Sequence, residues 1–137
     1  LVAEVRARLP ELPIIAVPGP SALTATVSIA GLPIHEFIFV GFLPHKKGRE
    51  TLIKEIAQSE RAFIFYESTH RIDKALTALA KYMQELVGSE RQVLVARELT
   101  KTFEEAILLT PSEHLARMQN NTYKMKGEFV IVVPSVK

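Results

Sequence analysis

Cysteine is absent from this chain of 137 residues. Without cysteine the protein has no disulfide framework, no thiolate zinc site and no cysteine nucleophile, and such a composition fits a protein of the cytoplasm. Long hydrophobic runs are absent as well. None reaches the ~18 residues that a membrane-spanning helix needs, and no signal peptide is visible. We therefore expect a globular protein that works in the cytoplasm.

An excess of charge of one sign is also missing. The 17 lysines and arginines nearly balance the 15 aspartates and glutamates, which gives a formal net charge of +2. This balance excludes a chain-wide basic footprint for nucleic acid, so only a local cluster could bind a polyanion. A glycine-rich phosphate loop and a G-x-G-x-x-G fingerprint are absent too, which excludes the usual phosphate cradles.

Metal-ligand spacing is not found among the four histidines either, so we expect no metal site; they are His35, His45, His70 and His114. What the chain does have is 47% hydrophobic residues, enough for the core of one domain. The chain opens with Leu1 in a helical pattern that Pro10 ends. We interpret residues 1–12 as the tail of a preceding domain or linker helix, and residues 13–137 as one α/β domain.

Two apolar runs each end in a cluster of ionisable side chains. Residues 62–66 precede Glu67-Ser68-Thr69-His70-Arg71, and residues 93–96 precede Arg97-Glu98-Leu99-Thr100-Lys101. Continuous apolar runs of this length predict strands buried on both faces, with helices covering both sides of a sheet. Ligands of open α/β sheets bind at the carboxyl ends of the strands. The two polar clusters therefore predict a site at one edge of the sheet.

The rest of the pattern predicts a mixed sheet of about five strands with interleaved helices. Further strands are expected over residues 14–17, 37–43, 102–109 and 129–133, and helices over 21–31, 52–56 and 72–83. The short link from Thr100 to Thr102 predicts a hairpin. A capping box with proline at the first helical position, Thr110-Pro111-Ser112-Glu113, predicts a last helix.

The helix that begins near Ser21 is apolar nearly all round, so we expect it to be buried between this domain and a preceding one that the chain lacks. Pro20 suits its first turn, and Gly31 suits its C-terminal cap. Ser21 follows a tight turn, but no base is identifiable beside it, so a capping serine is favoured over a nucleophile. The backbone N–H groups at this helix start could still hold a ligand carboxylate or carbonyl.

Six short motifs occur together and in one order along the chain. They are Val17-Pro18-Gly19-Pro20-Ser21-Ala22, Gly41-Phe42-Leu43-Pro44, Phe65-Tyr66-Glu67-Ser68, His70-Arg71, Ala96-Arg97-Glu98-Leu99-Thr100-Lys101 and Lys126-Gly127-Glu128. In this combination the chain resembles, from Pro13 onward, the C-terminal domain of the ribosomal RNA small subunit methyltransferase I family, within the tetrapyrrole methylase superfamily. Two positions depart from the family. Thr69 replaces a typical proline, which should loosen the turn that aims His70 and Arg71, and His45 replaces a common arginine.

The resemblance implies an enzyme that uses S-adenosylmethionine to methylate the 2′-hydroxyl of a cytidine ribose in small-subunit ribosomal RNA. It further implies two α/β domains per subunit, a homodimer, and a cofactor held in the cleft between the domains. Carried over residue by residue, the implied cofactor contacts are Ser21, Ala22, Tyr66, Glu67, Thr100, Gly127 and Glu128.

A ribose hydroxyl is a poor nucleophile, so a general base helps its methylation. Glu67, His70 and Glu98 are plausible bases, and we predict that Glu67 or His70 is catalytic. An ordinary salt-bridge network among the same side chains is an equal alternative. Arg71, Arg97 and Lys101 could hold phosphates.

Positive charge also gathers in the turn from His45 to Arg49. We predict that Lys46, Lys47 and Arg49 contact the ribosomal RNA backbone, although a solvated surface loop is equally compatible. Two other functions remain open: methylation of corrinoid or porphyrin precursors, and a non-catalytic module for dimerisation or docking.

Overall fold

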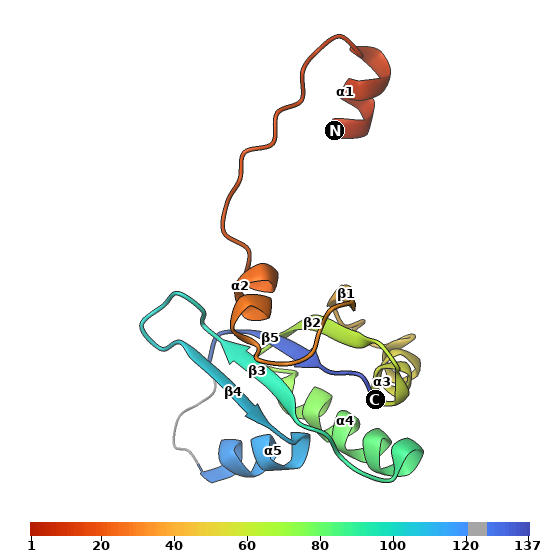
Figure 1. The fold of residues 1–137 in the computed structure, drawn as a ribbon, viewed down its shortest axis with the longest axis vertical. Helices are drawn as coiled ribbons and strands as arrows, with labels where there is room; N and C mark the ends of the chain where they lie inside the picture. Colours follow the sequence, from red (N-terminus) through yellow and green to blue (C-terminus); the bar gives the residue numbers. More distant parts are fainter. Residues whose placement is uncertain (121–125) are drawn as a thin grey trace.

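The computed structural model describes residues 1–120 and 126–137, and its centre is a five-stranded sheet (Figure 1). The strands are β1 (Phe37–Phe42), β2 (Ala62–Ser68), β3 (Val93–Arg97), β4 (Glu105–Leu109) and β5 (Glu128–Val133). Their order is β1-β2-β5-β3-β4, with β1 parallel to β2 and the other three pairs antiparallel. The predicted mixed α/β sheet and the β3–β4 hairpin are confirmed.

Two cores form because alternate residues of the central strands face opposite sides of the sheet. On one side, Phe63 and Phe65 of β2 pack with α3 (Arg49–Gln58), α4 (Ile72–Val87) and α5 (Pro111–Asn120). On the other side, Ile64 packs with α2 (Ala22–Ile29) and the segment that follows it. Figure 1 shows α2 on one side of the sheet and α4 and α5 on the other. Helices thus cover both faces, as the buried runs predicted.

Helix ends follow the signals in the sequence. The C-cap of α4 is Gly88, at a φ of 87°, a left-handed conformation that glycine adopts without steric cost. At the start of α5, a Glu113 carboxylate oxygen accepts bonds from the Thr110 backbone N–H at 2.8 Å and from its hydroxyl at 2.9 Å. The predicted capping box is therefore confirmed.

Two expectations about local structure were wrong, the strand over residues 14–17 and the start of the strand that ends at Leu109. Residues 14–17 form no strand; the whole segment from residue 9 to residue 20 is exposed and unpaired. Apolar character alone cannot make a strand, because its backbone groups need a neighbouring strand. Strand β4 begins at Glu105 rather than residue 102, since the connection from β3 is a longer turn. Helix α2 fully buries only Thr26, with Leu23 and Val27 partly buried against the sheet, and its burial against a preceding domain stays a prediction.

The start of α2 also differs from expectation. Ser21 occupies the N-cap position, but its side chain makes no capping hydrogen bond, and Pro20 lies before the helix. Helix α1 (Val2–Arg8) has no buried residue and lies beyond the exposed segment, away from the sheet (Figure 1). Among the described residues, no helix has the length and apolarity needed to cross a membrane.

Candidate functional site

The carboxyl ends of β1, β2 and β3 lie at the same edge of the sheet. Strands β2 and β3 both run antiparallel to β5, which lies between them, and β1 runs parallel to β2. The start of β5 therefore meets the ends of both neighbours: Ser68 pairs with Glu128, and Arg97 pairs with Phe129. The two polar clusters predicted from the sequence converge at this edge.

A cavity of about 230 Å³ opens at this edge, on the side of the sheet that α2 covers. Its lining comes from α2, from the ends of β1, β2 and β3, and from the start of β5: Ala22, Phe42, Tyr66, Ala96, Glu98, Leu99, Lys101, Glu128, Phe129 and Val130. Ala96 leaves space at its floor because its side chain is small. Ligand pockets usually hold about 300–1,000 Å³, so this cavity can enclose only part of a larger ligand.

One wall of the cavity is aromatic. The Tyr66 ring meets Phe39 edge-on, with 5.0 Å between centroids, and meets Phe42 in the same way at 5.5 Å. Phe42 is 55% exposed and Phe39 is 41% exposed. Edge-to-face packing holds the Tyr66 ring in place while part of the aromatic surface stays open. This wall is suited to a flat apolar group such as a nucleobase.

The rim of the cavity is polar. The Glu98 carboxylate accepts a hydrogen bond from the Lys101 ammonium at 2.9 Å and one from the Glu128 backbone N–H at 3.1 Å. These two bonds, the first above all, hold the pKa of Glu98 below its ordinary value. The same contact raises the pKa of Lys101. The rim therefore offers an ionised carboxylate that can accept hydrogen bonds from hydroxyl or ammonium groups.

The backbone at the rim is strained. Glu98 and Thr100 adopt left-handed conformations, with φ values of 49° and 65°, which residues other than glycine rarely do. Gly127 has a φ of 121°, and a Cβ added to it would lie 2.5 Å from the Glu98 side chain. Strained residues of this kind concentrate at binding sites, where the surrounding structure holds them. This observation supports a ligand site independently of the cavity.

Thr69 ties two of these turns together. Its hydroxyl donates to the Gly127 carbonyl at 2.8 Å and accepts from the Gly127 backbone N–H at 2.9 Å. The turn after β2 is thereby joined to the turn before β5. Threonine at this position anchors the turn through two hydrogen bonds, where loosening was expected.

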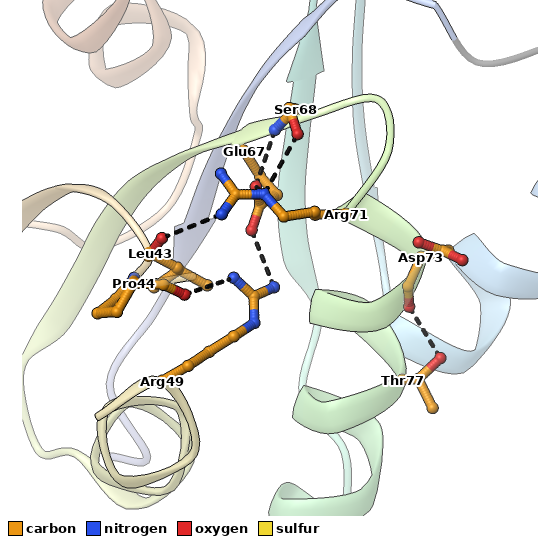
Figure 2. Close-up of polar contacts among 8 residues, drawn as sticks. All are labelled: Leu43, Pro44, Arg49, Glu67, Ser68, Arg71, Asp73 and Thr77. Carbon is orange, nitrogen blue, oxygen red and sulfur yellow. Dashed lines mark hydrogen bonds and ion pairs between the residues drawn. The ribbon is translucent and has the colours of Figure 1, made fainter. Parts of the chain in front are cut away.

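A second polar group lies on the opposite face of the sheet, where α3 and α4 pack (Figure 2). Glu67 follows Tyr66 in β2, so its side chain points away from the cavity. Its carboxylate is fully buried and pairs with Arg49 at 2.9 Å and Arg71 at 3.0 Å. We call these three residues the Glu67 cluster.

The structure thus divides the predicted site residues between two faces. Ala22, Tyr66 and Glu128 line the cavity, together with Lys101 from the predicted phosphate contacts. Ser21, Thr100 and Gly127 are sequence neighbours of lining residues but do not line it themselves. His70 is exposed on the turn between β2 and α4. Their functional roles remain predictions.

The remaining predicted phosphate contacts are of two kinds. Lys46 and Lys47 are exposed in the turn before α3. Arg49 and Arg71 are held by Glu67, and Arg97 lies 3.5 Å from Glu105 and donates to the Lys126 carbonyl. An arginine held in this way is less free to reach a ligand than an exposed lysine.

Several cavity residues were not predicted as cofactor contacts: Phe42, Ala96, Glu98, Leu99, Phe129 and Val130. Alternation within the strands could have placed Ala96 on the same face as Tyr66 once the pairing was known. The sequence carries no direct signal for that pairing, because Tyr66 and Ala96 both pair with Val130 of β5, which lies 64 and 34 positions later in the chain. Among the described residues, no group of three or more histidine or acidic side chains is arranged to hold a metal ion.

The site and fold together define an α/β domain with a cavity at the carboxyl ends of its strands. A family model described as Tetrapyrrole (Corrin/Porphyrin) Methylases matches residues 1–116, and the chain belongs to this family. Methylases of this family take their methyl group from S-adenosylmethionine, so the predicted cofactor is supported at the level of the family.

Curated relatives carry a more specific name than the family model. The chain is 46% identical over 118 residues to "Ribosomal RNA small subunit methyltransferase I" of Xylella fastidiosa (strain 9a5c), which covers 85% of this chain and 42% of the relative. The protein of the same name from Thermotoga maritima is 38% identical over 117 residues, covering 85% of this chain and 50% of the relative. The chain therefore spans half or less of the length of these two relatives.

Solved structures agree on the fold. The methyltransferase CobJ aligns with a TM-score of 0.60 and 22% identity, covering 98% of this chain and 57% of that one. The cobalt precorrin-4 methyltransferase CbiF aligns with a TM-score of 0.59 and 17% identity, covering 94% and 55%. At these identities the similarity shows the fold alone.

Proposed function

We propose that this chain forms the C-terminal part of an S-adenosylmethionine-dependent enzyme that methylates the 2′-hydroxyl of a cytidine in small-subunit ribosomal RNA. The observation that carries the proposal is the cavity at the strand ends, whose lining includes Ala22, Tyr66 and Glu128, three of the proposed cofactor contacts. The names of the relatives supply the ribosomal RNA substrate. Residues 1–12 would then belong to the connection with a preceding domain.

The residues of the cavity fit part of this cofactor. The wall formed by Phe42 and Tyr66 suits a purine ring, and the ionised Glu98 suits ribose hydroxyls. The volume of about 230 Å³ is small for the whole molecule. We therefore propose that the cavity holds the adenosine portion and that a second wall, outside this chain, encloses the rest. When bound, S-adenosylmethionine supplies an electrophilic methyl group.

The chain's own task in such a reaction is alignment. In-line displacement needs the ribose oxygen behind the methyl group, and alignment alone can lower a barrier by roughly 7–11 kcal/mol. His70 is the candidate base, because it is exposed beside Thr69, whose hydroxyl contacts the rim glycine Gly127. Normal turnover by a His70→Ala enzyme would exclude this role for His70. Dimerisation remains a prediction.

Blocking the cavity tests the cofactor proposal. We expect S-adenosylmethionine at millimolar concentration to shift amide NMR signals of Ala96, Leu99 and Val130 in this chain, with weak affinity because one wall is missing. Ala22→Leu adds bulk at an exposed residue of the lining and should weaken binding about 10-fold, or ~1.4 kcal/mol. Thr24→Leu is the matched control, exposed on the same helix outside the cavity, and should change affinity less than about 2-fold. Equal effects of the two variants would contradict the proposal.

The RNA proposal is tested by the salt dependence of binding. Replacing Lys46 and Lys47 by alanine should reduce the slope of log affinity against log salt by roughly 1.4–1.8, since each phosphate contact contributes about 0.7–0.9. A ribosomal RNA oligonucleotide and fluorescence anisotropy suffice. The control is the pair Arg61→Ala and Lys137→Ala, which removes the same charge near the start of β2 and at the end of the chain. A slope that falls equally in both variants would indicate only a general effect of net charge.

One observation favours a second function. The matching family model is described as corrin and porphyrin methylases, and the solved structure of CbiF is described as that of a cobalamin biosynthetic enzyme, so a corrinoid or porphyrin precursor is the alternative substrate. The exposed basic turn with Lys46 and Lys47 favours RNA, because a polyanion is what such a turn attracts. RNA affinity that is independent of this turn, together with methylation of a corrinoid precursor, would favour the alternative.

A further inference from the structure

The Glu67 cluster has no place in the cavity, yet it is the most buried ionic group among the described residues. Glu67 is 0% exposed, and the Arg49 and Arg71 side chains are 15% and 18% exposed. A carboxylate in such a position costs free energy unless it is paired and hydrogen-bonded. Here both oxygens have partners, because Oε2 pairs with Arg49, and Oε1 pairs with Arg71 and accepts the Ser68 backbone N–H at 2.9 Å. Glu67 is thus enclosed and paired at both oxygens, away from the solvent-exposed surface that a substrate hydroxyl would approach.

The two arginines that pair with Glu67 also hydrogen-bond to the chain that follows β1. Arg49 donates to the Pro44 carbonyl at 3.3 Å, and Arg71 donates to the Leu43 carbonyl at 3.5 Å (Figure 2). Leu43 and Pro44 begin the turn that carries Lys46 and Lys47. Arg49 is also the first residue of α3, which follows this turn. The turn is therefore held at both ends by groups that converge on one carboxylate.

The geometry points to Glu67 as a positioning residue for RNA: we propose that it acts through Arg49 and Arg71 to hold the turn of residues 43–48, so that Lys46 and Lys47 meet RNA phosphates. This inference rests on the proposed RNA substrate. It assigns Glu67 neither the role of general base nor a contact with the cofactor. Lysine has a flexible side chain, so a fixed backbone is what can give two lysines a defined spacing.

Glu67→Gln separates positioning from plain electrostatics by the sign of its effect. Removing a negative charge makes the protein more cationic, so electrostatics alone predicts tighter RNA binding. Positioning predicts weaker binding, by about 10-fold or ~1.4 kcal/mol, because the arginines lose their ionic anchor and the turn loses its fixed form. Glu85→Gln is the matched control, an exposed glutamate of α4 with the same charge change, and should leave affinity equal or slightly tighter.

Two further measurements distinguish this role from a general loss of structure. Amide NMR signals of Leu43 and of residues 45–48 should shift in the Glu67→Gln protein, while those of Ala96 and Val130 on the cavity face should not. In a protein that already lacks Lys46 and Lys47, Glu67→Gln should cause no further loss of affinity. If Glu67→Gln does not fold, Arg49→Lys keeps the charge but loses the planar fork that contacts both Glu67 and Pro44, and it should weaken RNA binding in the same way.

The outcomes separate this inference from the function on which it rests. If replacing Lys46 and Lys47 leaves RNA binding unchanged, the proposed RNA contact itself fails. If that replacement weakens binding but Glu67→Gln tightens it as Glu85→Gln does, only the positioning role is overturned. Weaker binding by Glu67→Gln, with shifts in the turn of residues 43–48 and at the direct contacts of Glu67 but not at Ala96 and Val130, supports the inference.

Discussion

Replacing Gly127 by alanine is expected to lower the free energy of unfolding by about 2–4 kcal/mol and to weaken cofactor binding with it. The backbone at this position has a φ of 121°, and the new Cβ would lie 2.5 Å from atoms of the Glu98 side chain. Glu98 would have to move, and its bonds to the Lys101 ammonium and the Glu128 backbone N–H would break. The substitution therefore disturbs the polar rim as well as the fold.

Gly88→Ala is the control for this experiment. Gly88 also has a positive φ, 87°, but no atom lies within 4 Å of the position its Cβ would take. Its substitution should cost only the backbone term, about 1–2 kcal/mol. Chemical denaturation of both variants measures the difference. Equal losses of stability would show that contact with Glu98 contributes nothing.

Replacing Arg91 by alanine should lower the free energy of unfolding by about 2–4 kcal/mol without any role in the site. Its guanidinium donates to the carbonyls of Pro134 at 2.7 Å, Ala57 at 2.7 Å and Ile56 at 2.9 Å. Two of these carbonyls belong to the last turn of α3, where helical carbonyls lack a partner of their own. Arg91 thus joins the end of α3 to the chain after β5.

A comparison with lysine tests this role of the planar guanidinium. Arg91→Lys keeps a positive charge but cannot reach three carbonyls with the same geometry, so it should recover less than half of the lost stability. Arg91 is partly buried, and this burial lowers its pKa. Arg61→Ala, an exposed arginine, should change stability by less than about 0.5 kcal/mol. If the Arg91→Ala protein unfolds at the same denaturant concentration as the unaltered protein, these hydrogen bonds do not contribute to stability.

Much of the sheet was predictable because its signals are local. The apolar runs that became β2 and β3 are continuous, and the polar residues at their ends mark the edge where the cavity opens. The capping box at Thr110 and the glycine at Gly88 set helix boundaries from a few adjacent residues. The prediction of a strand over residues 14–17 was wrong, because an apolar pattern in one segment does not show whether another strand is available to pair with it.

The division of the site between two faces was not predictable in the same way. Tyr66 and Glu67 are neighbours in the sequence, and the resemblance assigned both to the cofactor. Successive side chains of β2 point to opposite faces of the sheet, so Tyr66 lines the cavity and Glu67 contacts the two arginines. Which side holds the cavity depends on where α2 packs, and α2 lies more than 30 residues earlier in the chain.

The amino-acid sequence by itself determined where the buried strands lie, where several helices begin or end, and that charged side chains gather after two of the strands. These features arise from hydrophobic pattern and backbone preference, which act over a few residues. Only the tertiary structure decided that Glu98 meets Gly127, that Thr69 joins two turns, and that Glu67 is enclosed by Arg49 and Arg71. The physical reason is that Glu67 and Arg49 are 18 positions apart and Thr69 and Gly127 are 58 positions apart, so these contacts exist only once the sheet has formed. Arg71 is only four positions from Glu67, but it meets the carboxylate on the face that the register of β2 selects.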